Sequence, residues 1–154
     1  MLYGTERNGK IMFVKQISVF VENKSGKLVE IIGILAKSNI DISALSIADT
    51  TDFGILRLIV NDPEKAKAAL REHGMVVKTT NVIALAIPDE PGGLVGALDI
   101  LKENGVAIEY MYAFVGKSDK GAMVILKTDD PDTAVKALEK AGSFVVDAKD
   151  VYRL

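Results

Sequence analysis

Two kinds of hydrophobic spacing follow one another twice along this chain. Ile17, Val19 and Val21 alternate with Ser18 and Phe20, which is the period-two pattern of a strand with one buried face. The next apolar residues have the spacing of one helix face and are Leu28, Ile31, Ile32 and Leu35. The pattern therefore predicts a strand followed directly by an amphipathic helix.

The same pattern returns 66 residues later, which indicates a duplicated domain. Ile83–Ile87 matches Ile17–Val21, and the helix face recurs at Leu94, Ala97, Leu98 and Leu101. Beyond Asp49 the offset grows to 68. The pairs matched at this second offset are Asp62-Pro63 with Asp130-Pro131, Leu70 with Leu138, and Gly74 with Gly142. A period of this length is that of a domain and not of a solenoid repeat.

Each copy reads as strand, helix, strand, strand, helix, strand. Second strands are expected at 40–50 and 106–116, third strands at 55–60 and 122–127, fourth strands around 76–77 and 145–146, and turns at 51–52 and 117–120. Asn39 and Gly105 are expected to end the first helices, and Gly74 and Gly142 the second helices, because these residue types tolerate a left-handed conformation. The second helices are expected to begin at the Asp-Pro pairs, where an N-cap acid precedes proline.

The predicted fold class is α+β. It contains two ferredoxin-like βαββαβ domains, each with an antiparallel sheet that carries both helices on one face. We predict an N-terminal extension at 1–12, a first domain at 13–81 and a second domain at 82–154. The extension is interpreted as a flexible segment or as a consequence of where translation was assigned to start.

Composition excludes several classes of protein. The 154 residues include 19 basic and 21 acidic side chains, well mixed, with a net charge of −2, which is unlike a nucleic-acid binder. There is no cysteine, so a disulfide scaffold, thiol catalysis and cysteine-based zinc sites are excluded. No apolar run approaches the ~20 residues needed to span a bilayer. We therefore expect a cytoplasmic protein without a cofactor, a metal ion, a nucleic acid or a membrane as partner.

No catalytic constellation is apparent. His73 is interpreted as a helix-end cation, because no second histidine or cysteine exists to assist it. Ser25 lacks a histidine positioned by sequence to activate it, and Gly92-Gly93 lacks the spacing of a phosphate loop. The acidic pairs Asp129-Asp130 and Asp49…Asp52 are interpreted as cap and hairpin residues. We therefore expect that the protein is not an enzyme.

The two strand-to-helix loops are candidate binding sites for a small anion or zwitterion. Unpaired N–H groups and the positive end of the helix dipole favour a carboxylate there, and Gly26, Gly92 and Gly93 leave room for close approach. Asn23 or Asp89 could receive an ammonium group. The remaining loop candidates are Lys24, Ser25, Lys27, Glu90 and Pro91, with Leu28 and Leu94 as an apolar floor. Lysines make the first loop cationic, whereas acids make the second anionic. In the competing interpretation, the glycines are turn residues and Asn23 and Asp89 merely cap helices.

The segments Glu22–Leu28 and Pro88–Leu94 resemble the first loop of ACT domains, and Asn39–Ser43 and Gly105–Glu109 resemble that family's second strand. The stretch Ile108–Phe114 is similar to free-standing tandem ACT proteins from bacteria. This resemblance covers about residues 13–154. It implies a regulatory protein that binds an effector, most often an amino acid, between ACT units. It adds Ile42, Ile108 and Tyr110 as wall residues of the site, a homodimer, and a separate metabolic enzyme as the regulated partner. The alternative function is a protein-interaction module that acts without a ligand.

One strand of the second copy is apolar on both faces. Tyr110, Tyr112 and Phe114 share one face, and Met111 lies on the other. Because the helices of a ferredoxin-like sheet cover one face, we expect the other copy or a second chain to shield the second face. An RNA-binding use of these aromatic side chains requires basic surroundings, which Glu109 and the net negative charge do not provide.

Overall fold

The computed structural model describes residues 6–7, 9–49, 53–116, 119, 121–142 and 144–154. The described residues form two compact units. We call residues 15–80 the N-terminal unit, and residues 81–153 together with the segment up to residue 14 the C-terminal unit. The predicted turns at 51–52 and 117–120 lie outside the described residues, apart from residue 119.

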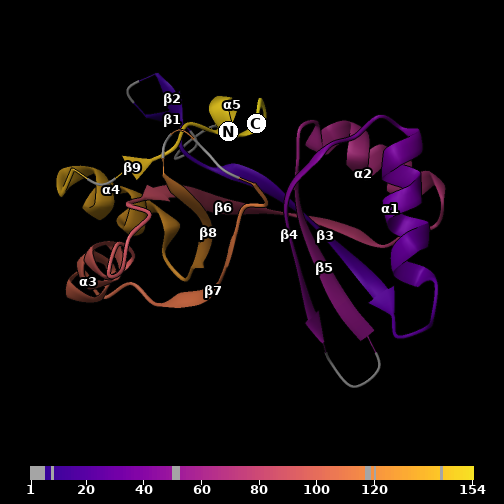
Figure 1. Ribbon diagram of the computed structural model, residues 1–154, viewed down its shortest axis with the longest axis horizontal. Coiled ribbons are helices and arrows are strands. Elements are labelled where there is room, and N and C mark those ends of the chain that lie inside the picture. Colours follow the sequence, from indigo (N-terminus) through magenta and orange to yellow (C-terminus); the bar gives the residue numbers. More distant parts are fainter. Residues whose placement is uncertain (1–5, 8, 50–52, 117–118, 120, 143) are drawn as a thin grey trace. The chain divides into compact units, whose positions relative to one another are not determined.

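The N-terminal unit has the predicted order of elements (Figure 1). Its elements are β3 (Val14–Glu22), α1 (Lys27–Lys37), β4 (Ile42–Asp49), β5 (Phe53–Val60), α2 (Pro63–Glu72) and the first residues of β6 (Val77–Ile87). The strands lie in the order β4-β5-β3-β6, with β3 and β4 both antiparallel to β5. Both helices cover the same face of this sheet (Figure 1).

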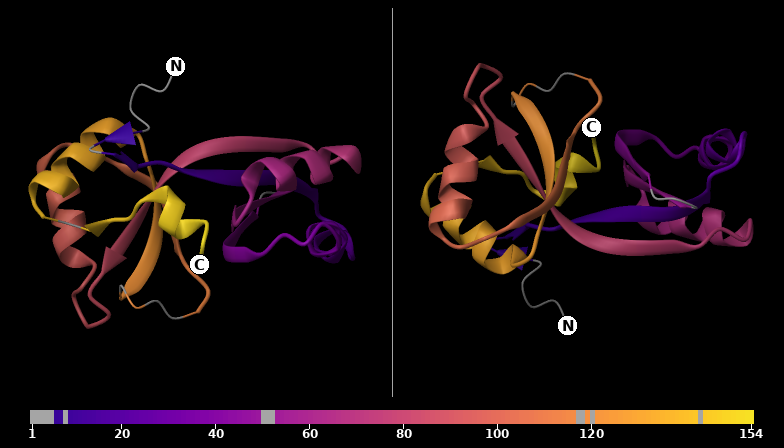
Figure 2. Two further views of the ribbon diagram at one scale, coloured as in Figure 1. Left: turned by 90° about the horizontal axis from the view of Figure 1, so that it is seen from above. Right: turned by 90° about the horizontal axis from the view of Figure 1, so that it is seen from below.

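The C-terminal unit repeats this arrangement. Its elements are the rest of β6, α3 (Val95–Glu103), β7 (Ile108–Ala113), β8 (Ala122–Thr128), α4 (Pro131–Lys140), β9 (Phe144–Val145) and α5 (Ala148–Val151). The strands lie in the order β7-β8-β6-β9, and α3 and α4 lie together on one side of them (Figure 2). The predicted α+β class with two ferredoxin-like units is therefore confirmed.

The duplication extends to individual hydrogen bonds. The Asn61 side chain accepts a hydrogen bond from the backbone N–H of Asp41 at 3.0 Å, and Asp129 accepts one from Ala107 at 2.9 Å. Both second strands carry a β-bulge directly after their first residue, as the register shifts at Ile42/Ala44 and Ile108/Tyr110 show. The predicted helix ends are also confirmed, with positive φ at Asn39 (55°), Gly105 (70°), Gly74 (77°) and Gly142 (76°).

Each unit buries its own hydrophobic core between its sheet and its helices. The N-terminal core is centred on Ile17, Val19, Ile31, Leu35, Leu56, Leu58 and Leu70. The C-terminal core is centred on Ile83, Leu85, Leu101, Val124, Leu126 and Leu138. Met12 and Phe13 belong to this second core and are 1% and 7% exposed, although they precede the N-terminal unit in the chain.

Several elements differ from the sequence predictions. Within the predicted extension, β1 (Glu6–Arg7) pairs antiparallel with β2 (Lys10–Ile11). The fourth strand of the C-terminal unit has two residues and leads into α5, which was not predicted. These short elements have no hydrophobic period of their own. By contrast, the fourth strand of the N-terminal unit continues as the first strand of the C-terminal unit in β6, as the absence of a Pro/Gly/Ser-rich spacer at 79–81 predicts.

Candidate functional site

The strand-to-helix loops occupy residues 23–26 between β3 and α1, and 88–94 between β6 and α3. Each loop turns into its helix through a glycine with a left-handed backbone, since φ is 85° at Gly26 and 81° at Gly92. Residues with a Cβ rarely adopt this conformation. The same internal hydrogen bond closes both loops, from Lys27 N–H to the Lys24 oxygen at 3.3 Å and from Gly93 N–H to the Glu90 oxygen at 3.0 Å.

The helices that follow these loops lack a side-chain cap, whereas the other helices have one. Asp62 accepts a hydrogen bond from the Lys65 N–H at 3.1 Å, and Asp130 accepts one from the Thr133 N–H at 3.1 Å. The N-cap residues of α1 and α3 are Gly26 and Leu94, and neither forms a side-chain cap hydrogen bond. Asn23 and Asp89 therefore do not occupy the N-cap positions. The first turns of α1 and α3 keep donors that a ligand could satisfy.

The donors left over can be identified from the backbone hydrogen bonds. In α1, the first N–H bonded in the helical pattern is that of Glu30, which donates to the Gly26 oxygen at 3.1 Å. The N–H groups of Leu28 and Val29 find no backbone acceptor among the described residues. In α3, the same holds for Gly96 and Ala97 within the part of the chain that is described. Val29, Gly96 and Ala97 are not among the predicted site residues, because a free main-chain donor leaves no signal in the residue type.

The space beside the glycines differs between positions. A Cβ placed on Gly26 or on Gly92 would meet no atom within 4 Å, so both face open space. A Cβ placed on Gly93 would instead overlap the carbonyl oxygen of Pro88. Gly93 is therefore required by the folding of the loop on itself, and the predicted role of this glycine in admitting a ligand has no support in the geometry.

The charges of the two loops are arranged differently. In the first loop, Lys24 pairs with Glu22 at 3.1 Å and Lys27 pairs with Glu30 at 3.3 Å. The hydrogen bond and the charge of Lys24 lower the pKa of Glu22. The first loop therefore presents balanced charge and not the cationic surface that its lysines alone suggest. In the second loop Asp89 and Glu90 are exposed, and neither forms an ion pair within the described part of the chain.

The other predicted site residues are divided by the fold. Asn23, Ser25 and Pro91 are exposed on the loops, Leu28 is 39% exposed, and Leu94 packs against the C-terminal core. Ile42 and Ile108 pack against the cores of their own units. Because β3 and β4 run in the same direction, Ile42 at the start of β4 lies at the opposite end of its sheet from the first loop.

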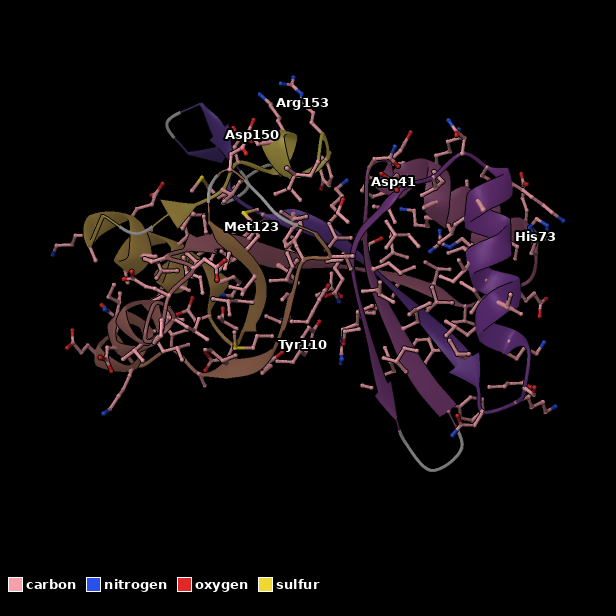
Figure 3. All side chains as sticks on the ribbon, in the orientation of Figure 1. Asp41, His73, Tyr110, Met123, Asp150 and Arg153 are labelled. Carbon is pink, nitrogen blue, oxygen red and sulfur yellow. The ribbon has the colours of Figure 1, made fainter. Side chains whose placement is uncertain are left out.

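Tyr110 lies on the sheet face that carries no helix. Met111, its neighbour, packs against the C-terminal core, so Tyr110 points to the other side, as alternation in a strand requires (Figure 3). Within one unit, therefore, the structure groups residues 23–28 on one loop and 89–94 on the other. It does not bring the second-strand residues to the loop of the same unit.

Other chemistry finds no support among the described residues. They contain no group of three or more His, Cys, Asp or Glu side chains arranged to hold a metal ion. His73 is the C-cap of α2, where its Nδ1 lies 2.8 Å from the carbonyl oxygen of Ala69 (Figure 3). No helix in the described ranges has the length and hydrophobicity to cross a membrane.

Comparison with known proteins identifies relatives over nearly the whole chain. Residues 12–154 match the sequence family described as the ACT domain pair. The crystal structure of protein BT0572 from Bacteroides thetaiotaomicron is 42% identical, with a TM-score of 0.87 over 93% of this chain and 98% of that chain. No curated protein matches the sequence.

More distant structures share the fold. The ligand-free regulatory subunit of aspartate kinase from Thermus thermophilus is 15% identical, with a TM-score of 0.58 over 84% of this chain and 93% of that chain. The corresponding subunit from Thermus flavus is 13% identical, with a TM-score of 0.56 over 85% of this chain and 94% of that chain. At these identities the likeness concerns the fold alone.

Proposed function

Because the chain belongs to the family of ACT domain pairs, whose domains are regulatory modules, we propose that it is a non-catalytic sensor of a small effector. The effector that fits best is a free amino acid bound at the strand-to-helix loops of residues 23–28 and 89–94. Ligand binding changes the relative populations of conformations that a partner protein distinguishes.

One observation carries this proposal: α1 and α3 lack side-chain caps, whereas α2 and α4 are capped by aspartates. An α-carboxylate at Gly26 would accept hydrogen bonds from the N–H groups of Leu28 and Val29, which find no backbone acceptor among the described residues. The positive end of the helix dipole supports the same assignment. The open space beside Gly26 and Gly92 leaves room for such a group.

The remaining groups of an amino acid also have candidate partners in each loop. Asn23 in the first loop and Asp89 in the second offer an oxygen to an α-ammonium group. Leu28 is 39% exposed and offers apolar contact to a ligand side chain. A carboxylate is disfavoured beside Asp89 and Glu90 by like charge, so we expect the first loop to bind more tightly than the second.

The regulated partner in this proposal is a separate metabolic enzyme. Structures with the same fold include proteins described as regulatory subunits of aspartate kinase. A regulatory subunit is a separate chain from the catalytic subunit. This supports a regulatory role in trans, with the direction of regulation set by which conformation the partner binds.

Isothermal titration calorimetry and thermal shift with each of the twenty common amino acids test the proposal. We expect at least one to release or absorb heat with a saturable isotherm and to raise the melting temperature, because a ligand that binds the folded state alone stabilises it. If no amino acid binds and the chain nevertheless forms a stable complex with a metabolic enzyme, the sensor proposal is wrong. The alternative, an interaction module that acts without a ligand, then replaces the sensor proposal.

A further inference from the structure

Two aliphatic side chains remain exposed beside the main-chain donors of the first loop. Leu28 and Val29, whose N–H groups find no backbone acceptor among the described residues, are 39% and 71% exposed. Side chains on an α-helix tilt towards its N-terminus, so both lean over the first turn of α1. A carboxylate bound to these two N–H groups would therefore bring the rest of its molecule next to an aliphatic surface.

The second unit carries the same feature at the duplicated position. Val95 corresponds to Val29 at the offset of 66 and is 55% exposed. Valine is a weaker helix former than alanine or leucine, so helix stability does not account for an exposed valine at this place in both copies. The two loops differ in charge but share this aliphatic residue.

The capped helices have the opposite character in their first turns. The first turn of α2 presents Glu64 and Lys65, and the first turn of α4 presents Asp132 and Thr133. Neither of these two fully described helices has an exposed aliphatic residue in its first turn. The aliphatic surface therefore accompanies the uncapped donors of α1 and α3 and is not a general property of helix starts in this protein.

The charged side chains of the first loop are already paired with each other. Glu22 lies 3.1 Å from Lys24, and Lys27 lies 3.3 Å from Glu30. A ligand with a charged side chain would meet no unpaired opposite charge among these four groups. A ligand with an apolar side chain needs no such partner and gains free energy by covering the aliphatic surface.

We propose that the effector of the first loop is a free amino acid with an apolar side chain, which packs on Leu28 and Val29 while its carboxylate accepts hydrogen bonds from their N–H groups. This inference rests on the proposed function, because it names the ligand class of the same site. The main-chain donors hold the carboxylate of every amino acid alike, so the surrounding side chains select among amino acids. Val95 has the same role in the second loop.

Isothermal titration calorimetry of the full chain with leucine, phenylalanine, alanine, aspartate and lysine tests the ligand class. We expect leucine or phenylalanine to bind at least about tenfold more tightly than the other three, because one buried methylene of a ligand already changes affinity by roughly tenfold or more. If alanine, aspartate or lysine binds as tightly, this inference is wrong and the sensor proposal stands. If none of the twenty common amino acids binds, both are wrong.

The substitution Val29→Thr tests the contact itself, because it keeps the shape of the side chain and replaces a methyl group by a hydroxyl group. It should weaken the binding of the preferred apolar amino acid about fivefold and change the binding of alanine little. The matched control is Val76→Thr, which is 64% exposed but precedes the core residue Val77 and so points to the sheet face without helices. This control should bind like the parent. Equal affinity of Val29→Thr and the parent for the apolar amino acid would overturn the inference.

Discussion

The two units share one topology, but they differ on the face of the sheet that the helices leave open. In the N-terminal unit this face carries Gln16, Ser18, Phe20 and Arg57. At the duplicated positions the C-terminal unit has Val82, Ala84, Ala86 and Ile125, all of which are buried. Phe20 is 45% exposed, whereas its counterpart Ala86 is 3% exposed.

The helix-side face changed much less between the copies. Ile17, Val19, Leu56 and Leu58 correspond to Ile83, Leu85, Val124 and Leu126, and every one is buried. A close-packed core restricts substitution to apolar side chains of similar volume. On the opposite face, Gln16 and Ser18 are buried like their counterparts Val82 and Ala84, but they are polar where the counterparts are apolar. The two copies therefore differ most on the sheet face that their own helices leave uncovered.

The largest loss of stability is expected from a substitution at Phe13, which precedes the N-terminal unit but packs into the C-terminal core. Phe13→Ala should destabilise the C-terminal unit by roughly 3 to 4 kcal/mol, as truncation of a buried phenylalanine does. Hydrogen exchange read by mass spectrometry should show lost protection in residues 81–153. Loss confined to residues 15–80 would contradict the assignment. Phe20→Ala, at an exposed position, is the control and should cost far less.

A smaller loss is expected in the second loop. Gly93→Ala drives a Cβ into the carbonyl oxygen of Pro88 and should destabilise the protein by about 2 kcal/mol, measured by urea unfolding. The control is Gly96→Ala in α3, where a Cβ meets nothing within 4 Å and a gain of about 0.5 kcal/mol is expected. Lys27 occupies the position of Gly93 in the first copy, so equal stability of the parent and Gly93→Ala would mean that the two loops fold alike.

Lowering the pH should weaken the stabilisation that the N-cap residue Asp130 gives to α4. The Thr133 hydroxyl, 2.6 Å from Asp130, and the Thr133 N–H lower the pKa of Asp130 in the folded protein. A carboxyl with a lowered folded-state pKa stabilises the fold above its unfolded pKa, and this contribution is lost as the pH falls through the folded pKa. Asp130→Asn should therefore reduce stability at neutral pH and flatten the acid branch of the stability profile. An unchanged acid branch in urea titrations at successive pH values would argue against it.

The smallest change in stability should give the largest change in ligand response. Gly26→Asn and Gly74→Asn both place asparagine, which tolerates a left-handed backbone, at a positive φ beside open space. Each should cost less than about 1 kcal/mol. Because Gly26→Asn fills the space beside the free donors of α1, the thermal shift by an amino acid should fall in that variant and persist in Gly74→Asn. Equal thermal shifts in both variants would show that the ligand does not bind at the first loop. Comparing Gly92→Asn with Gly142→Asn repeats the test for the second loop.

Much of the fold is predictable because the duplication shows each element twice. The Asp-Pro pairs predict the starts of α2 and α4, and Asn39 and Gly74 predict helix ends, since each rests on local backbone chemistry. The packing of Phe13 into the C-terminal core, far from it in the sequence, is a tertiary event without a local signal. The two bulges, α5 and the β1–β2 hairpin are similarly too short to show a hydrophobic period.

The candidate site is predictable to the level of the loop and no further. The glycines and the missing cap residues at the starts of α1 and α3 can be read from the sequence. Whether a glycine faces open space, as Gly26 does, or its own loop, as Gly93 does, depends on the path of the backbone. The ion pairs of Lys24 and Lys27 likewise depend on side-chain geometry. For this reason the cationic first loop predicted from its two lysines was wrong.

The placement of Met12 and Phe13 has a consequence for how the protein emerges from the ribosome. The N-terminal unit can fold once residue 80 has left the exit tunnel, since domains generally fold as units, N-terminal first, during synthesis. Met12 and Phe13 are synthesised earlier and remain exposed to water until β8 and α4 have been synthesised. During that interval the nascent chain displays two large apolar side chains next to a finished domain, which makes this segment a natural point of contact for a chaperone.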